Sequence, residues 1–155
     1  LVQAMVGLRD GRGAVRWETL RRELGEPGFG RDLFVKMDVE GVEYEVLPAV
    51  LEDGARITGL ALEFHRLDLH WGRLLELQAA WEGDFAMVHV HGNNGDTLIQ
   101  GTSVPKALEV TLVARDLLTL EETGRHFAGP LPRPGLDFPN DPERQEFSLL
   151  ASVPD

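Results

Sequence analysis

The chain has 155 residues, of which 43% are apolar and 26% are charged, a composition typical of one soluble globular domain. Its formal net charge of −11 opposes a phosphate backbone, so we expect no nucleic-acid partner. No apolar run is long enough for a membrane span, and the first residues lack the pattern of a signal peptide, so we expect no membrane partner and a cytoplasmic location. The absence of cysteine excludes disulfides and thiolate metal sites.

The first quarter of the chain predicts a hairpin and a short helix. Two short apolar segments, residues 1–8 and 14–17, flank the turn-forming sequence DGRG, which favours a β-hairpin. TLRREL, residues 19–24, predicts a helix that ends at the loop GEPGFGRD. The glycines of this loop come before a strand, whereas a cofactor-binding loop follows a strand and opens a helix.

A strand followed by a helix then occurs twice. Residues 33–38 (LFVKMD) are too short and apolar for a typical helix and predict a buried strand, and residues 42–51 repeat apolar side chains at helical spacing. Residues 57–64 (ITGLALEF) predict the second strand, and residues 67–81 predict a helix with a broad apolar stripe.

Two further strands and a proline-rich ending follow. Residues 85–90 and 107–114 predict strands that run antiparallel, because the segment between them carries no helix signal. We expect residues 1–125 to form the domain and residues 126–155 to form a proline-rich extension that packs on it or trails from it.

The alternation of strands and helices predicts an α/β fold with three layers: a mostly parallel sheet, helices on both of its faces, and an antiparallel terminal strand. In such sheets ligands bind at the carboxyl ends of the strands. Chemistry is therefore expected where the strands of residues 33–38 and 57–64 end.

Acids and histidines occur at these strand ends with a spacing of two. The pairs are Asp38-x-Glu40, Glu63-x-His65 and His89-x-His91. If the first two strands are neighbours, about 4.8 Å apart, then Asp38, Glu63 and His65 converge. Such a group could be a general base with orienting carboxylates, or a site for a hard metal ion.

Structural roles compete with these interpretations. Glu40 and Glu43 lie at the start of a helix, where carboxylates can cap free amides. Glu63 and His65 could simply form a satisfied pair. In the sequence HVHGNN, the side chains of Asn93 and Asn94 could recognise a substrate or scaffold a loop, and we expect no metal site there.

The segment KMDVEGVEYEVL resembles the KIDVEGAEYEVL signature of the FkbM-type methyltransferases. The resemblance continues through MVGLRDGRGAV, TLRREL, LALEFH, HVHGNN and LEVTLVAR, and through the ending GPLPRPGLDFPNDP. It spans nearly all of the chain. It implies a Rossmann-like methyltransferase fold with the strand order 3-2-1-4-5-7-6 and an enzyme that uses S-adenosylmethionine to methylate a hydroxyl of a small molecule or sugar.

On this resemblance, Asp38 would lie at the junction of cofactor and acceptor. His65 would be the general base and Glu63 would orient it. Glu40 and Glu43 would order the loop or contact the acceptor. Asn93 and Asn94 would shape the acceptor pocket.

The chain also departs from this family. The strands that carry the glycine-rich loop and the ribose-binding acid are not found, so we expect a C-terminal portion of a longer product, inactive alone, with strand 33–38 as an apolar edge. Residues 1–15 or a partner chain, through self-association, would cover that edge. The alternatives are a non-catalytic scaffold left after loss of the cofactor half, and a metal-dependent hydrolase using Asp38, Glu63 and His65. His89 and His91 are left out of the inner group, because the family order places a strand between them and His65.

Overall fold

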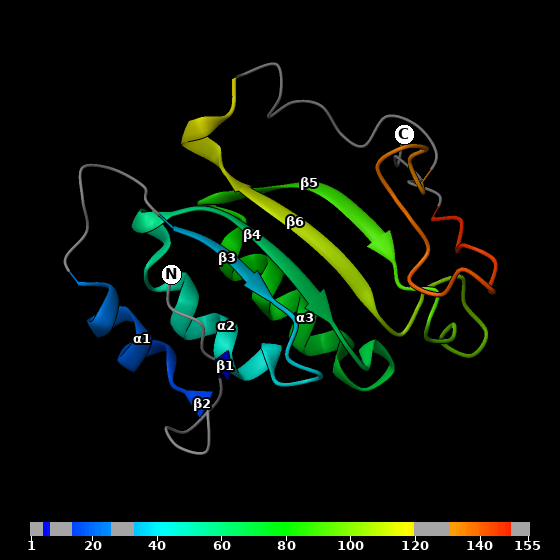
Figure 1. Cartoon of the computed structure of the whole chain (residues 1–155), viewed down its shortest axis with the longest axis horizontal. Coiled ribbons are helices and arrows are strands. Elements are labelled where there is room, and N and C mark those ends of the chain that lie inside the picture. The colour runs from blue at the N-terminus through cyan, green and yellow to red at the C-terminus, as the bar shows by residue number, and fades with distance from the viewer. Residues whose placement is uncertain (1–4, 7–13, 26–32, 120–130, 150–155) are drawn as a thin grey trace.

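A computed structural model describes residues 5–6, 14–25, 33–119 and 131–149 (Figure 1). The strands in these ranges are β1 (Met5–Val6), β2 (Ala14–Val15), β3 (Leu33–Met37), β4 (Ile57–Phe64), β5 (Phe85–Gly92) and β6 (Leu108–Ala114). The helices are α1 (Trp17–Leu24), α2 (Glu43–Leu51) and α3 (Leu67–Trp81), with 3-10 turns η1 (Gly54–Arg56) and η2 (Arg115–Leu117). The strands and helices predicted from residue 19 onward to residue 114 are confirmed.

The main sheet has four strands in the order β3-β4-β6-β5. The predicted parallel pairing of β3 with β4 is confirmed, with Met37 opposite Leu62. The predicted antiparallel pairing of β5 with β6 is also confirmed, with His91 opposite Glu109. β6 runs against both of its neighbours and lies between them, so the sheet is open and mixed.

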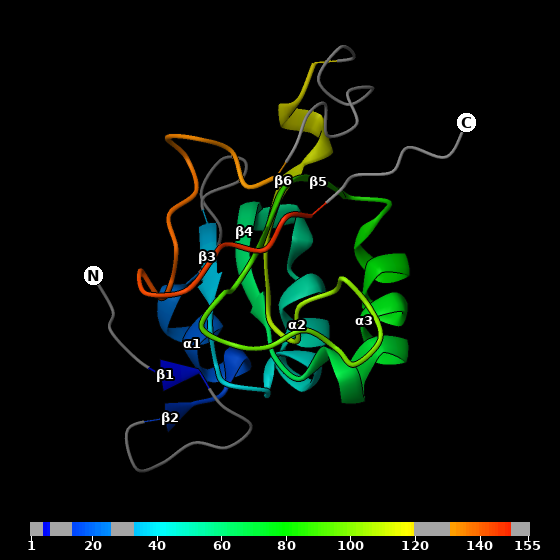
Figure 2. The ribbon, with the colours of Figure 1, turned by 90° about the vertical axis from the view of Figure 1, so that its right-hand side faces the viewer.

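All three helices lie on the same side of this sheet, as a row beneath the strands in Figure 2. The expectation of helices on both faces is therefore wrong for the described residues. The reason lies in the alternation of side chains: Leu60, Leu62 and Phe64 of β4 are buried on the helix side, whereas Glu63 and its cross-strand partner Glu109 face the other way. A polar face offers no apolar surface for a helix to bury.

The core fills the space between the helices and the sheet. Leu67, Leu74, Leu77 and Trp81 recur along one stripe of α3 and are buried. The ring of Trp81 packs against Phe64 of β4, with ring centroids 6.0 Å apart. This packing holds the last residue of β4 against α3, and His65 is the next residue in the chain.

The N-terminal elements lie beside the main sheet. Trp17 Nε1 and Arg21 both donate to the carboxylate of Asp53, at 2.8 and 2.9 Å, and attach α1 to the end of α2. β1 and β2 form a separate parallel pair, with Met5 opposite Ala14. A hairpin requires antiparallel strands, so the predicted hairpin is wrong for these four residues. Its turn, residues 10–13, lies outside the described residues.

β3 forms one edge of the sheet, and β4 is its only strand partner among the described residues. Phe34 on this edge is 62% exposed. The apolar edge predicted from the sequence is therefore confirmed for the described part of the chain. Self-association through it stays a prediction.

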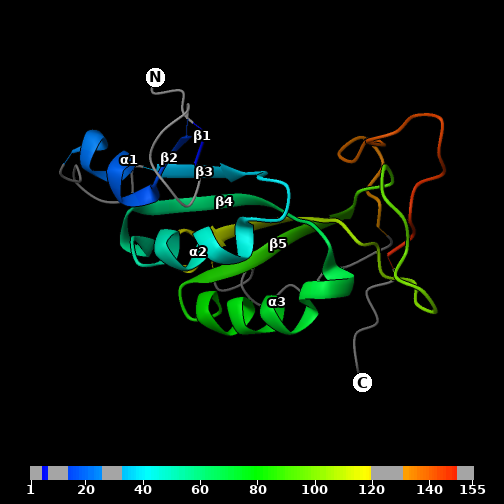
Figure 3. The same ribbon diagram turned by 90° about the horizontal axis from the view of Figure 1, so that it is seen from below.

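Residues 131–149 form an extended segment at the end of the sheet toward which β3, β4 and β5 point (Figures 1 and 3). Asn94 holds it: its amide nitrogen donates to the carbonyl oxygens of Asp141 and Arg144, and its oxygen accepts from the Asp141 amide. A Cβ at Gly92 would lie 2.7 Å from Pro105, so only glycine fits this close approach. The predicted domain boundary at 125/126 lies outside the described residues.

Within the described ranges, every helix falls short of the combined length and apolar character needed to cross a bilayer.

Candidate functional site

Three side chains predicted to converge do so at the carboxyl ends of β3 and β4. Asp38 follows β3, Glu63 is the penultimate residue of β4, and His65 follows β4. The His65 Nε2 atom lies 3.8 Å from Asp38 Oδ1 and 3.5 Å from Glu63 Oε1. The parallel register of the two strands brings these groups to one point on the edge of the sheet.

Glu43 holds this arrangement from inside the protein. Its carboxylate is fully buried and accepts the amide of Gly41 at 2.8 Å, the amide of His65 at 2.5 Å and the His65 Nδ1 group at 3.2 Å. The expected contact of Glu43 with an acceptor is wrong, because none of its surface is exposed. Its other expected role, ordering the loop, is what these hydrogen bonds do.

The position of Glu43 on its helix explains why it points inward. Glu43, Val46, Leu47 and Val50 are spaced as one face of a helix, and all four are buried. This spacing was visible in the sequence and could have identified Glu43 as the residue that orients His65, a role we had expected for Glu63.

The contact with Glu43 determines how the His65 ring is used. Glu43 Oε1 also accepts the His65 amide, so this oxygen acts as an acceptor and Nδ1 is the donor in the contact. With the proton on Nδ1, a neutral ring carries its lone pair on Nε2, which is directed outward. That lone pair faces Asp38, Glu40 and Glu63 at 3.5 to 3.8 Å, beyond hydrogen-bond length. Nε2 is thereby placed to accept a proton from a bound molecule.

The backbone is strained on both sides of this group. Glu40 and Arg66 adopt left-handed φ angles of 55° and 52°, which cost a non-glycine residue roughly 1–2 kcal/mol each. Gly41, with φ 103°, completes the turn between β3 and α2 without that cost. This turn directs Glu40 toward His65, with Oε2 at 3.6 Å from Nε2, so Glu40 does not cap α2.

A metal ion is one chemical possibility for this group. One donor atom each from Asp38, Glu40 and His65 lies within 4.8 Å of the others. Two carboxylates and an imidazole are ligands that several divalent ions accept. The hydrogen bond from Nδ1 to Glu43 is also the kind of outer contact that orients a metal-binding histidine.

Glu63 receives its own support from Asn93. Asn93 Nδ2 donates to Glu63 Oε1 at 2.6 Å, and its oxygen accepts the Gly95 amide at 2.8 Å. Burial raises the pKa of Glu63; the hydrogen bond from Asn93 opposes this shift and the nearby Asp38 charge adds to it. Asn93 therefore belongs to the site through Glu63.

Asn94 is different from its neighbour. It is buried and its side chain is engaged by residues 141 and 144. Our expectation that Asn94 shapes the acceptor pocket is wrong, because its hydrogen-bonding groups are used to hold the C-terminal segment.

A cavity of about 300 Å³ opens beside the site on the helix-free face of the sheet. Asp38 and Glu63 form part of its wall, and Lys36, Glu109 and Asp137 form another part. A small molecule in this cavity would meet two of the carboxylates near His65, those of Asp38 and Glu63.

His89 and His91 form a separate cluster, since β6 lies between β5 and β4 as expected. His89 Nε2 is 2.6 Å from Asp137 Oδ1. The buried His91 lies between Glu109 at 2.9 Å and Glu146 at 3.1 Å. Both histidines thus pair with acids of residues 131–149.

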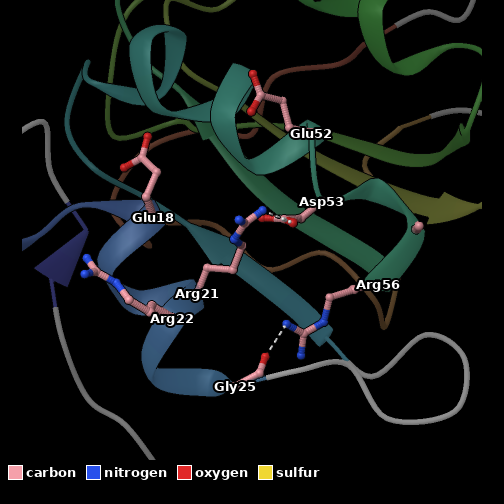
Figure 4. Close-up of a pocket in the computed structure, with 8 residues that line it drawn as sticks. Glu18, Arg21, Arg22, Gly25, Glu52, Asp53 and Arg56 are labelled. Atoms are coloured by element: carbon pink, nitrogen blue, oxygen red, sulfur yellow. Dashed lines mark hydrogen bonds and ion pairs between the residues drawn. The ribbon is translucent and has the colours of Figure 1, made fainter.

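A larger cavity, about 700 Å³, lies at the opposite end of the sheet, between α1, the end of α2 and η1 (Figure 4). There Arg21 points to Asp53, and Arg56 donates to the Gly25 carbonyl oxygen at 3.1 Å. Its charges are largely matched by one another, and none of the described residues that line it is a histidine. Its chemistry is therefore less suited to catalysis than that of the smaller cavity beside His65.

The family resemblance implies a glycine-rich loop for S-adenosylmethionine, and neither the turn after β3 nor the turn after β4 is rich in glycine. The turn from β3 to α2 has one glycine and two acids, and the turn from β4 to α3 consists of His65 and Arg66. Neither is the glycine-rich loop that such a cofactor requires. Asp38 is the one residue among the described ranges that we had assigned to the cofactor.

Comparisons with protein-family profiles, with curated proteins and with solved structures find no match.

The hydrogen bonds of Glu43 predict a stability effect. Glu43→Gln should lower the free energy of unfolding by about 1–3 kcal/mol, because an amide cannot accept from all three donors and leaves a buried N–H unpaired. Urea denaturation would measure it. Glu45→Gln, at an exposed position of the same helix, is the control and should change stability by less than about 0.5 kcal/mol. Equal effects of the two substitutions would contradict the role of Glu43.

The surroundings of His91 predict a pH dependence. Burial lowers the pKa of His91, but its hydrogen bonds to Glu109 and Glu146 outweigh this and raise it. The stabilisation is therefore complete below the ordinary histidine pKa of about 6.5 and is lost as the pH rises through the higher folded value.

Hydrogen exchange, corrected for the intrinsic effect of pH, should show residues 141–149 losing protection as the pH rises above neutrality. His91→Gln should remove this pH dependence, whereas His70→Gln on α3 should retain it. The same pH dependence in the His91 variant would show that another group controls the segment.

Proposed function

We propose that this chain forms the acceptor side of an S-adenosylmethionine-dependent O-methyltransferase of the FkbM type. The observation that carries the proposal is the His65 ring, held by Glu43 through Nδ1 with Nε2 directed to the carboxylates beside a cavity. The acceptor is a hydroxyl of a small molecule or sugar.

The topology supports this proposal. The order β3-β4-β6-β5 has the form expected for the 4-5-7-6 end of the family's fold, with the last strand reversed and inserted before the end. The DVEG segment that resembles the family signature lies in the turn after β3, at the edge where His65 also lies. The arrangement is consistent with other Rossmann-like folds as well, so the site chemistry carries more of the proposal than the topology.

The chemistry assigned to this chain is proton removal from the acceptor hydroxyl. His65 Nε2 accepts the proton, and the Glu43 carboxylate stabilises the resulting imidazolium through Nδ1. Glu63, held by Asn93, and Asp38 position the hydroxyl by accepting hydrogen bonds from neighbouring groups of the acceptor. S-adenosylmethionine would supply the methyl group; no step of its binding or reaction is assigned to the described residues.

A metal-dependent hydrolase is a second candidate, favoured by the close spacing of the Asp38, Glu40 and His65 donor atoms. There a divalent ion would activate water for attack, and Glu63 would be the base. Hydrolytic activity that appears with added divalent ions and is lost with a chelator would favour this candidate over methyl transfer.

The test is methyl transfer from tritiated S-adenosylmethionine to hydroxylated acceptors. It is made with this chain and with the product that includes any coding sequence in frame ahead of Leu1. Where such coding sequence supplies the cofactor-binding strands, we expect transfer by the product that includes it. Calorimetry should show little cofactor binding by the chain alone, because the described residues lack the cofactor loop.

In the active product, His65→Gln should lower kcat by about 10²–10⁴-fold, the usual contribution of a general base. Glu76→Gln, an exposed position on α3, should keep the parent rate. A His65 variant with the parent rate, or a longer product that neither binds the cofactor nor transfers methyl, would overturn the proposed function.

A further inference from the structure

The proposed site carries more negative charge than its own groups can balance. Four carboxylates lie within 3.8 Å of a ring nitrogen of His65, namely those of Asp38, Glu40, Glu43 and Glu63. Among the described residues, no lysine or arginine forms an ion pair with any of them. Even with His65 charged and one carboxylate protonated, two negative charges remain.

These charges differ in how far they are already satisfied. Glu43 has three N–H donors, and Glu63 has Asn93. Among the residues that the structure describes, Asp38 and Glu40 have only the distant ring nitrogen of His65 as a charged partner, at 3.8 and 3.6 Å, and their side chains are 40% and 87% exposed. They are therefore the two acids that a bound molecule can reach and pair with.

The adjoining cavity has the same sign of charge. Four carboxylates contribute to its wall, those of Asp38, Glu63, Glu109 and Asp137. Among the described residues that line it, the basic side chains are Lys36 and His89, and His89 is paired with Asp137 at 2.6 Å, so carboxylates remain in excess. Partly shielded walls of one sign concentrate the field on a ligand of the opposite sign. A neutral polyol would leave Asp38 and Glu40 repelling each other, whereas a cationic group would relieve that repulsion.

We infer that the acceptor carries an ammonium group on the carbon next to its reacting hydroxyl, as in an amino alcohol or an amino sugar. This inference rests on the proposed function. The hydroxyl lies at His65 Nε2, and the ammonium donates to Asp38 and Glu40. One donor or acceptor atom of each of these three residues lies within 4.8 Å of the others, a span that two neighbouring polar groups of one small molecule can bridge.

The test compares ligands that differ by one charge, using the full chain. D-glucosamine and D-glucose are titrated at neutral pH into ¹⁵N-labelled protein, and the ring signals of His65 are followed. Glucosamine should shift them with at least tenfold tighter binding than glucose. Asp38→Asn should weaken glucosamine binding about tenfold, with little effect on glucose, whereas Glu76→Gln should leave both unchanged. Each variant's amide spectrum shows that it is folded.

Several results would overturn the inference. Equal binding of glucose and glucosamine would remove the preference for a cation, and so would the absence of any shift with either sugar. Magnesium ions that shift the His65 signals while glucosamine does not would assign the carboxylates to a metal ion. If the chain binds glucosamine as expected but the longer product shows no methyl transfer, the result would instead count against the proposed function and leave the charge preference of the site in place.

Discussion

The buried carboxylate of Glu43 is the constraint on which the site depends. It joins the turn after β3 to the residue after β4, because it accepts an amide from each and the ring of His65 as well. A buried carboxyl group is tolerated only when it is hydrogen-bonded, and here three N–H groups donate to it. Glu40 and Arg66, with their strained left-handed backbone angles, lie on either side of these hydrogen bonds. The hydrogen bonds of Glu43 offset part of the free-energy cost of that strain.

The two faces of the sheet divide the work between stability and chemistry. One face packs Leu60, Leu62 and Phe64 against the helices and supplies the core. The other carries Glu63 and Glu109, together with the cavity and the extended residues 131–149. Because every strand alternates its side chains, a single sequence pattern builds both faces, and the rigidity of the first positions the groups on the second.

Much of the fold followed from local patterns, and much of the site followed from the fold. Apolar runs and helical spacing located β3, β4, α2 and α3, and adjacent parallel strands brought Asp38, Glu63 and His65 together. The placement of all three described helices on one face of the sheet was not predicted. The alternation of strands and helices implies crossover connections, but it does not determine on which face of the sheet each helix packs. The antiparallel direction predicted for the pair β1 and β2 was wrong, because a turn sequence does not by itself determine the direction in which two strands pair.

The missed features are mostly long-range contacts. His91 pairs with Glu146 and His89 with Asp137, positions 55 and 48 residues apart, and no local spacing signals such pairs. Asn94 was assigned to a pocket for the same reason, since its partners lie in the C-terminal segment. Glu43 is the exception, because its place on the apolar stripe of α2 was readable from the sequence.

The tautomer of His65 tests the central claim most directly. A long-range ¹H–¹⁵N correlation spectrum of the folded chain, recorded where the ring is neutral, distinguishes a protonated Nδ1 from a protonated Nε2. The structure predicts the proton on Nδ1, facing Glu43, and an unprotonated Nε2. A neutral ring protonated on Nε2 would contradict the account, because the atom assigned to accept the acceptor's proton would already carry one.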